Sequence, residues 1–459
     1  MIGCLSLARE TFDIEFANNK LVKTINIIKK LHSNIVFYDS LVTNDKVGSD
    51  ALKFFENNKC KKFIVIQSTF TDAKFISTFV KKFKKPLLFI SFKEKRTGGR
   101  LRLNSLCGVN LGLHSLIKNK FYSNFIIYSN NKEFFSKEVL KFIKSANNFP
   151  KKNYLKRISS SKKISEKIIN FKTPNLGLIG ERPEGFDTCD FNSKELKSKF
   201  DAKITKISLS NLFNISSKIE TSKINASKKN ISRDLKNLNQ LNQKEVNKSI
   251  SLFHGLEKIQ KKQNIDAFAI RCWPEMFTEY GCASCAPMAM MNENKISCAC
   301  EADVLGSLSC NILNQLNDKP SLLVDIVDLD EKDNTVVFWH CGLAPISMAG
   351  KNKTSATVHS NRRKPLLHDF AFKPGNITIF RVSKSENKLK FFLMKGKVLK
   401  RKNSFSGTSG VINLGSNTHK KIKNIFLSGL EHHVAFTYGD VFEDIKSLGM
   451  KLNIPTYTI

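Results

Sequence analysis

The chain has 459 residues, which is longer than one ordinary domain of about 100–200 residues, so two to four compact units are expected. The formal net charge is +35, but the basic residues are scattered along the chain instead of being clustered. A nucleic-acid surface needs basic residues gathered on one face, so this scattered charge argues against a nucleic-acid partner. The apolar content of 41% is enough to form buried cores.

The chain starts with a short apolar run that ends at Arg9 and Glu10. A secretion signal needs a preceding positive charge and a longer apolar core, and no segment approaches the roughly 18 uncharged apolar residues that cross a bilayer. The eleven cysteines, an odd number in a long chain, are typical of a reducing compartment. We therefore expect a cytoplasmic protein without a membrane partner.

Four apolar runs in the first third have the composition of buried strands. They lie at 34–40, 61–70, 85–92 and 123–130, and the intervals between them fit helices or loops. Alternating strands and helices predict a parallel sheet covered on both faces, here a Rossmann-like α/β domain over 1–155. Because ligands bind beyond the carboxyl ends of such strands, 67–72 and 94–102 are candidate functional loops. The segment 98–110 is either a turn with basic side chains near a substrate or a turn that leads into a helix.

A second α/β domain is predicted over 170–318. The Lys/Ser-rich stretch at 151–167 precedes it and is interpreted as a solvated linker. The domain opens with a strand at 176–179, and the glycines that follow do not form the G-x-G-x-x-G pattern of a dinucleotide site. Later, Ile250, Phe253, Leu256 and Ile259 have helical spacing, and a strand follows at 266–273.

Beyond residue 320 the pattern changes to strand-like runs joined by turn signals. The runs lie at 321–328, 334–342, 376–382 and 389–395, with the turn sequences KPG and SGTSG between some of them. This pattern predicts a β-rich, mainly antiparallel and barrel-like carboxyl-terminal domain over 319–459.

The segment CACEADVLGSLSC, residues 298–310, combines thiols with carboxylates. Cys282, Cys285, Cys298 and Cys300 could offer four thiolates to zinc, although a zinc ribbon usually repeats C-x-x-C and the second pair here is C-x-C. Because free cysteine is often buried, packed thiols explain the same pattern.

The carboxylates of this segment indicate a second kind of site. Glu301 and Asp303 precede a helical stripe of leucines and isoleucine, so Glu301 lies in or just before a first helical turn. The next strand, 321–325, ends at Asp325, and a helix followed by a strand can bring both carboxylates together. The spacing by itself favours the alternative of a capping glutamate and a solvated aspartate at a strand end.

Residues 271–325 and 429–455 resemble the L-fucose isomerase family and, more distantly, L-arabinose isomerases. The resemblance implies two Rossmann-like α/β domains followed by a β-rich domain over nearly the whole chain. It also implies that Glu301, Asp325 and His433 hold one divalent ion, usually Mn²⁺, with Mg²⁺ or another divalent cation as the alternative. The two carboxylates would also serve as acid and base. The resemblance further implies a homo-oligomer, such as a hexamer.

Interconversion of an aldose and a ketose through an ene-diol moves a weakly acidic proton between neighbouring carbons. A divalent ion can polarise the carbonyl and hold the developing oxyanion, while carboxylates transfer the proton. We therefore expect a metal-dependent aldose–ketose isomerase with a monosaccharide substrate. A non-catalytic sugar-binding or nucleic-acid-binding relative with the same fold is the alternative.

Arg271, Trp273 and His340 are expected to contact the substrate. L-fucose isomerases have Gln-Arg-x-Trp where this chain has Ile270-Arg271-Cys272-Trp273. An apolar residue thus replaces a polar one that could bind sugar hydroxyls, which favours a substrate other than fucose. His340, at the end of a β run, could equally be a packed core histidine.

Two adjacent histidines near the carboxyl terminus need different roles. In an extended strand, His432 and His433 would point to opposite faces. The resemblance selects His433 as the metal ligand, which leaves His432 packed or hydrogen-bonded on the other face.

Overall fold

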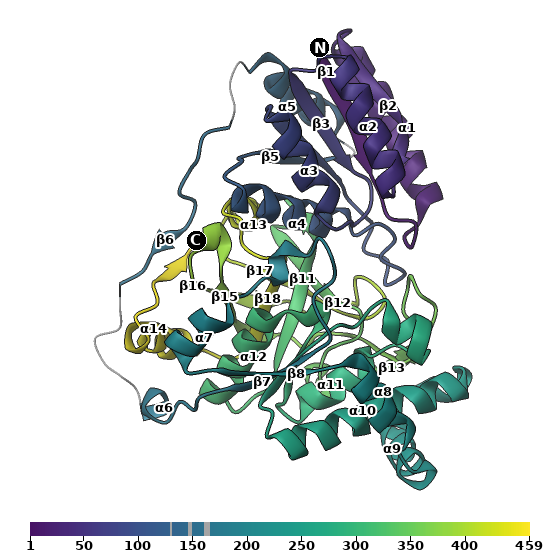
Figure 1. The fold of residues 1–459 in the computed structure, drawn as a ribbon, viewed down its shortest axis with the longest axis vertical. Coiled ribbons are helices and arrows are strands. Elements are labelled where there is room, and N and C mark those ends of the chain that lie inside the picture. Colours follow the sequence, from purple (N-terminus) through teal and green to yellow (C-terminus); the bar gives the residue numbers. More distant parts are fainter. Residues whose placement is uncertain (129–130, 146–148, 160–165) are drawn as a thin grey trace.

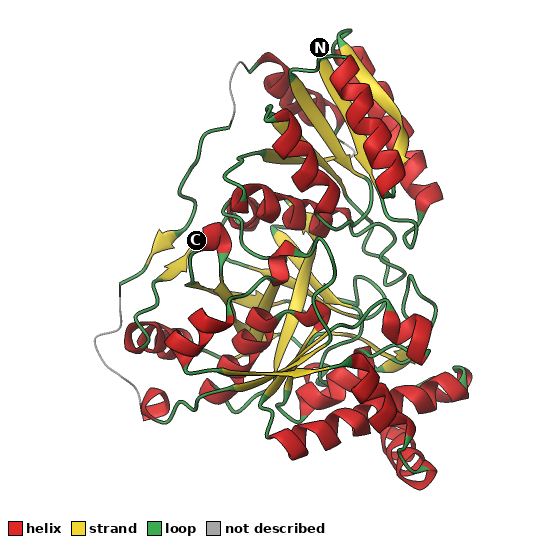
Figure 2. Cartoon of the chain, viewed as in Figure 1, coloured by secondary structure: helices red, strands yellow, loops and turns green. Residues whose placement is uncertain are grey.

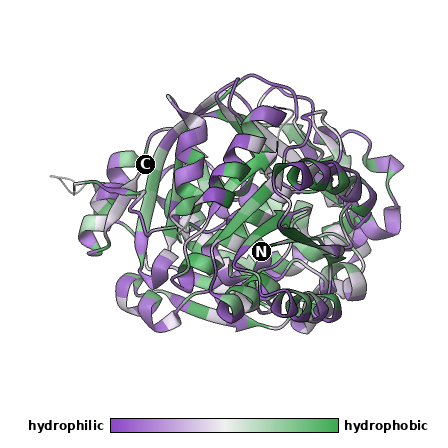
Figure 3. Cartoon of the chain, turned by 90° about the horizontal axis from the view of Figure 1, so that it is seen from above, coloured by the Kyte–Doolittle hydropathy of each residue, from purple (hydrophilic) through white to green (hydrophobic). Residues whose placement is uncertain are grey.

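The computed structural model describes residues 1–128, 131–145, 149–159 and 166–459. Its strands form three sheets with helices packed around them (Figures 1 and 2). Figure 3 shows apolar residues concentrated along the central strands, with many polar residues on the outer helices. Within the described residues, no helix is both long and apolar enough to cross a membrane.

The amino-terminal sheet is parallel and has the order β2-β1-β3-β4-β5. Its strands are β1 (Ile2–Leu7), β2 (Ile35–Val42), β3 (Lys62–Gln67), β4 (Leu87–Phe92) and β5 (Asn124–Tyr128). Between or after them come α1 (Ile14–Leu31), α2 (Asp45–Asn57), α3 (Lys74–Phe83), α4 (Ser105–Lys118) and α5 (Lys132–Lys144). The four predicted strands are confirmed, apart from residues 129–130, which lie outside the described residues. The initial apolar run forms β1.

Alternation along β3 explains why helices cover both faces of this sheet. Ile64 and Ile66 belong to a core that includes residues of α1 and α5. Phe63 and Val65 belong to another core that includes residues of α2, α3 and α4. Successive side chains of a strand point to opposite faces, so an apolar run without alternation becomes a strand buried on both sides.

The second sheet is also parallel and has the order β10-β9-β7-β8. Its strands are β7 (Asn175–Ile179), β8 (Lys203–Ile207), β9 (Ala267–Ile270) and β10 (Ser297–Ala299). The associated helices are α7 (Ser193–Phe200), α8 (Leu209–Ser217), α9 (Thr221–Asp234), α10 (Gln243–Gln263), α11 (Cys285–Glu293) and α12 (Val304–Leu316). The predicted strands at 176–179 and 266–273 and the helix around Ile250 are confirmed.

The third sheet has ten strands in the order β13-β14-β17-β12-β11-β18-β15-β16-β19-β6, with a further pairing between β16 and β17. Most pairs are antiparallel, as predicted, but β14–β17 and β16–β19 are parallel. The strands are β11 (Ser321–Asp330), β12 (Thr335–His340), β13 (Ser355–Thr357), β14 (Leu367–Ala371), β15 (Gly375–Ser383), β16 (Lys390–Val398), β17 (Thr408–Asn413), β18 (His433–Tyr438) and β19 (Thr456–Thr458). Helices α13 (Thr418–Leu427) and α14 (Phe442–Lys451) flank them.

Part of the segment expected to be a linker adds a strand to this sheet. Residues Lys156–Arg157 form β6, which pairs with β19 near the carboxyl terminus. A short helix, α6 (Glu166–Ile169), follows, and residues 160–165 of the segment lie outside the described residues. Both residues of β6 are exposed, so the segment is solvated there as expected, but its backbone also pairs with a strand distant in sequence, which the sequence did not predict.

Candidate active site

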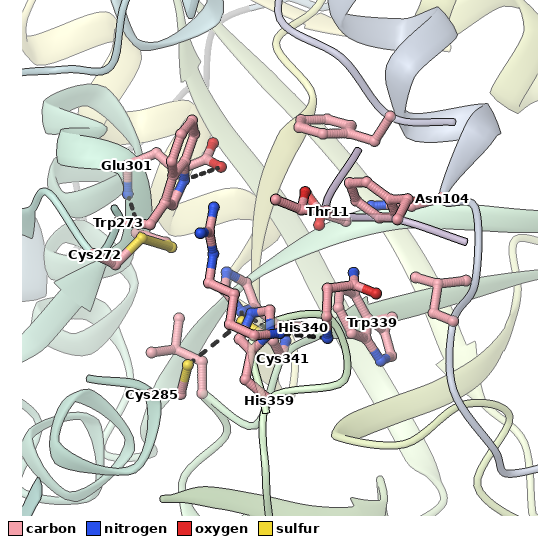
Figure 4. Close-up of a pocket in the computed structure, with 18 of the residues that line it drawn as sticks. Thr11, Asn104, Cys272, Trp273, Cys285, Glu301, Trp339, His340, Cys341 and His359 are labelled. Carbon is pink, nitrogen blue, oxygen red and sulfur yellow. Dashed lines mark hydrogen bonds between the residues drawn. A yellow bond between two sulfur atoms is a disulfide. The ribbon is translucent and has the colours of Figure 1, made fainter. Parts of the chain in front are cut away.

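One cavity lies where the three sheets meet (Figure 4). The two parallel sheets contribute residues that follow the carboxyl ends of β1, β3, β9 and β10, and the mixed sheet contributes side chains of β11, β12 and β18. The lining includes Arg9, Phe70, Trp273, Glu301, Asp325, Trp339, His340, Arg362, His432 and His433. Loops beyond the carboxyl ends of parallel strands are the usual place for a ligand in such sheets.

Glu301 lies in a single turn of 3₁₀-helix, Cys300–Ala302, between β10 and α12. Its backbone has φ 59° and ψ 26°, and Ala302 also has a positive φ. Non-glycine residues seldom adopt this left-handed conformation, which costs about 1–3 kcal/mol and is concentrated at functional sites. The prediction that Glu301 lies just before a helix is confirmed.

Asp325 and His433 are brought together by strand register. They are direct partners in the antiparallel β11–β18 pair, and Trp339 of β12 is the partner of Asp325 on its other side. Residues directly opposite in antiparallel strands share a face, so this row presents an imidazole, a carboxylate and an indole to the same cavity.

Asp325 does not end its strand, which corrects the sequence-based expectation. Strand β11 continues to Asp330 because the next residues remain apolar and pair with β12. The register of that pair shifts between Ile326 and Asp328, immediately after the carboxylate. Such bulges commonly redirect side chains beside active sites.

The two ring nitrogens of His433 face different carboxylates. Its Nδ1 lies 3.0 Å from Asp303 Oδ2, while Nε2 lies 3.4 Å from Asp325 Oδ1 and 3.8 Å from Glu301 Oε2. With Nδ1–H donating to Asp303, the lone pair of Nε2 is directed between the other two carboxylates. An imidazole whose second nitrogen donates to a carboxylate is the usual arrangement of a metal-ligating histidine.

Asp303 is itself fixed by a fully buried arginine. Arg381 donates to both carboxylate oxygens of Asp303, at 2.6 and 2.9 Å, and both side chains are almost inaccessible. Asp303 Oδ1 also accepts the Gly306 N–H at 2.8 Å, which caps α12. Burial favours the neutral acid, but the charge of Arg381 and the hydrogen bonds hold the pKa of Asp303 far below its usual value. The orienting partner of His433 is therefore a stable anion.

His432 contacts the same site, contrary to the prediction that it faces away. Its Nε2 donates to Glu301 Oε2 at 3.0 Å, and its ring centroid lies 3.8 Å from that of His433. Strand β18 begins only at His433, so the alternation of an extended strand does not apply to the pair. The prediction of opposite faces is wrong because His432 lies in the bend that precedes the strand.

Burial and nearby charges move the pKa values of the two cavity carboxylates in opposite directions. For Asp325, burial raises the pKa more than the two histidines lower it, and Oδ1 has no hydrogen-bond partner among the described residues. For Glu301, the opposing effects of His432, His433 and the Trp273 indole, which donates at 3.2 Å, outweigh burial and lower the pKa. Burial and the charge of His432 lower the pKa of His433, which favours the neutral imidazole that a metal needs.

The donor set fits a divalent metal ion. Ligands on adjacent corners of an octahedron with bonds of about 2.1 Å lie about 3 Å apart. His433 Nε2 lies somewhat farther from the two carboxylates, at 3.4 and 3.8 Å, so binding an ion would draw these groups closer together. Two carboxylate oxygens and one imidazole suit manganese or magnesium, and a cation would satisfy the unpaired oxygen of Asp325. One group of potential ligands within 4.8 Å of one another consists of Glu301, His432 and His433, and Asp325 is not part of it. Another contains Cys189, whose thiol has a strongly raised pKa through burial and therefore stays protonated.

The zinc–thiolate alternative is not supported by the positions of the cysteines. Cys300 forms a disulfide with Cys272, and Cys285 Sγ lies 3.5 Å from Cys341 Sγ. The proposed thiolates do not form a metal-ligand group among the described residues. All nine free cysteines are buried, which agrees with the alternative of packed thiols.

The expected substrate contacts divide into two groups. Trp273 and His340 line the cavity, and the ring centroids of His340 and His433 are 6.0 Å apart. Arg271 is not among the residues that line this cavity; its guanidinium pairs with Glu275 at 2.7 Å, and it lines a neighbouring pocket that shares Arg9 and Trp273. The basic segment at 98–110 leads into α4, as its second interpretation held, and contributes Leu101 and Asn104 to the lining.

Several cavity residues were not singled out from the sequence. Arg9 follows β1, so recognising the initial apolar run as a strand would have indicated it. His359, Asn361 and Arg362 lie on an irregular loop between β13 and β14, where no periodic pattern marks them.

Comparison with known proteins identifies the family of the chain. Residues 3–150 match the fucose/sulfoquinovose isomerase amino-terminal domain, and residues 368–459 match the L-fucose isomerase carboxyl-terminal domain. A sulfoquinovose isomerase of Priestia megaterium is 31% identical over 452 residues, which cover 98% of this chain and 97% of that protein. The chain belongs to the fucose isomerase-like family. It is an aldose–ketose isomerase, as are the enzymes of these families.

Two further members of the family match over nearly their whole length. The sulfoquinovose isomerase of Alkalicoccus urumqiensis is 29% identical over 460 residues, covering 99% of this chain and 98% of that protein. That of a Clostridium species is 26% identical over 461 residues, with the same coverage. Both matched domains contribute to the cavity, since the first contains Arg9 and the second contains His433. Glu301 and Asp325 lie in the stretch between them.

Proposed function

We propose that this isomerase is metal-dependent and that Glu301, Asp325 and His433 hold one divalent ion, Mn²⁺ or alternatively Mg²⁺. The observation that carries the proposal is the convergence of two carboxylate oxygens on His433 Nε2 while Asp303 holds Nδ1. An alternative ligand set has His432 in place of Asp325, and its donor atoms already lie within 4.8 Å of one another. The first set is preferred because no partner among the described residues orients His432 Nδ1, whereas Asp303 orients His433.

A divalent ion bound there would polarise the sugar carbonyl and stabilise the negative charge that develops on its oxygen. The carboxylates of Glu301 and Asp325 transfer the proton between the neighbouring carbons. His432 Nε2 and Trp273 Nε1 donate to separate oxygens of Glu301, so they orient its carboxylate and stabilise its ionised form. Trp273, His340 and the other aromatic lining residues bind the sugar and exclude water.

The proposed substrate is a hexose with a sulfonate at its terminal carbon, because the matched relatives are named sulfoquinovose isomerases. Family membership argues against the non-catalytic alternative. We also propose three structural units, 1–155, 170–318 and 319–459, with the β16–β17 pairing supporting a barrel-like third unit. A homo-oligomer in the cytoplasm is proposed on the resemblance and on the nine free cysteines.

Metal removal tests this function. Protein treated with chelator should lose turnover of sulfoquinovose to its ketose, and added Mn²⁺ should restore it, with the product followed by NMR. A chelated protein free of metal by elemental analysis that still isomerises the sugar at the original rate would contradict metal dependence. Asp318→Asn, at a strongly exposed position outside the cavity, is a control and should respond to chelator like the wild type.

A further inference from the structure

We propose that Arg362 is the specificity-determining residue that binds an anionic group at the terminal carbon of the sugar. The inference rests on the proposed function for its substrate, but the residues that carry it lie apart from the metal ligands. Arg362 lines the cavity from the loop between β13 and β14.

The guanidinium of Arg362 is held by aromatic rings and has no ion-pair partner among the described residues. Its central carbon lies 5.3 Å from the centroid of Trp273 and 5.2 Å from that of Phe277. These cation–π contacts leave the N–H donors without a hydrogen-bond acceptor among the described residues, so they are available to a ligand. The planar fork of an arginine matches the oxygen geometry of carboxylate, sulfonate and phosphate groups.

Arg9 provides an internal comparison, because it also lines the cavity and packs on Trp273, at 4.9 Å. Its guanidinium donates to Asp72 at 2.7 Å, so its charge is already compensated. Burial and the repulsion from Arg9 lower the pKa of Arg362, which means that its charge is less well compensated than that of an arginine in water. An anionic ligand would supply the missing partner.

The loop that carries Arg362 is already ordered by its own contacts. His359 Nδ1 accepts the backbone N–H groups of Asn361 and Arg362 at 3.2 and 3.3 Å, and Arg363 N–H donates to the His359 carbonyl at 2.8 Å. Arg100 Nε donates to Asn361 Oδ1 at 3.0 Å, which ties the loop to the amino-terminal unit. The backbone at Arg362 therefore needs little ordering when a ligand binds.

Trp273 connects this cation to the reacting end of the cavity. Its indole N–H donates to Glu301 at 3.2 Å, while its ring contacts the Arg362 guanidinium. The metal site and the cation are thus separated by about the width of one indole. A divalent ion would neutralise Glu301 and Asp325, and the positive charge of Arg362, which has no carboxylate partner among the described residues, complements one sulfonate or carboxylate. The chain therefore offers an anion-binding subsite at Arg362 to one end of the sugar and the proposed metal site to the other end.

The experiment compares a matched pair of sugars, 6-deoxy-6-sulfoglucose and 6-deoxyglucose, which differ only by the sulfonate. We expect Arg362→Gln to lower the ratio of their kcat/KM values by about 30-fold, chiefly through KM, because a charge-assisted contact is lost. Arg362→Lys should retain part of the ratio. Arg363→Gln removes the same charge from the adjacent exposed position, outside the lining, and should leave the ratio unchanged. Glucuronate and glucose 6-phosphate distinguish a carboxylate or phosphate preference from a sulfonate preference.

A ratio that stays the same in Arg362→Gln, or falls equally in Arg363→Gln, would overturn the proposal. If the wild type isomerises none of these sugars with Mn²⁺, the proposed function fails independently. Calorimetry then still tests the subsite, since the wild type should bind 6-deoxy-6-sulfoglucose more tightly than Arg362→Gln does. Equal affinities of the two proteins would reject the assignment of Arg362.

Discussion

The two ends of the cavity are built by different means. At the metal end, Glu301 and His433 are oriented by hydrogen bonds, and Asp303 and Arg381 form a buried ion pair behind them. At the other end, Arg362 is supported by aromatic rings and a turn, without a carboxylate partner among the described residues. Polar groups that are fixed by hydrogen bonds suit the reacting end, because the reaction needs one geometry. An arginine without a carboxylate partner suits the other end, because it can pair with an anionic group of the substrate. Changes at the two ends should therefore have separable effects.

The largest expected effect is loss of the proposed metal ligand His433. His433→Ala should lower Mn²⁺-dependent turnover by about a thousandfold or more, because metal-assisted and acid–base catalysis are lost together. Calorimetry should show weakened Mn²⁺ binding, while circular dichroism reports an intact fold. Equal Mn²⁺ affinity in wild type and variant would contradict the assignment.

The next effect concerns the buried ion pair behind the metal end. Asp303→Asn leaves Arg381 charged and without its bidentate partner, which should destabilise the fold by about 3–5 kcal/mol. It should also weaken Mn²⁺ binding about 10- to 100-fold, because His433 loses its orienting acceptor. Chemical denaturation and calorimetry measure the two effects. The exposed variant Asp318→Asn serves as the control and should match the wild type in both.

A smaller effect is expected at His432. His432→Ala removes one hydrogen bond to Glu301 but leaves the proposed ligands in place, so turnover should fall by about tenfold and remain measurable. The pKa of Glu301 should rise because its hydrogen bond and a nearby positive charge are lost. The acid limb of the pH–rate profile should therefore move to higher pH. A loss as large as that of His433→Ala would indicate that His432 is itself a ligand.

The smallest effect is a gain in stability without metal. Burial raises the pKa of Asp325, so its charged form opposes folding above the folded pKa, and this penalty disappears as the pH falls through that value. In chelator, Asp325→Asn should unfold at a higher temperature than the wild type at pH 7.5. The difference should vanish near the ordinary aspartate pKa of about 4. The same variant should lose Mn²⁺-dependent turnover, and equal melting temperatures at pH 7.5 would contradict the buried charge.

The sequence alone determined the elements whose side chains follow a period. Apolar runs marked β2 to β5, β11 and β12, and the stripe after Asp303 marked α12, because burial of a strand or a helix face repeats along the chain. The prediction of an isomerase came from the resemblance of the motifs around Glu301, Asp325 and His433 to the L-fucose isomerase family, and the spacing of these residues did not indicate it by itself. The end of the β11 strand was misplaced, because pairing with β12 extends it beyond the carboxylate.

Only the tertiary structure decided the contacts between distant elements. Arg381 reaches Asp303 across 78 residues, His432 reaches Glu301 across 131, and no local pattern marks either pair. Arg362 resembles any other residue of a basic loop until Trp273 and Phe277 are placed beside it. The disulfide between Cys272 and Cys300 likewise depends on the parallel register of β9 and β10, which ends those strands side by side. Such contacts depend on strand order and register. These are set by the packing of the whole chain and cannot be read from any local pattern in the sequence.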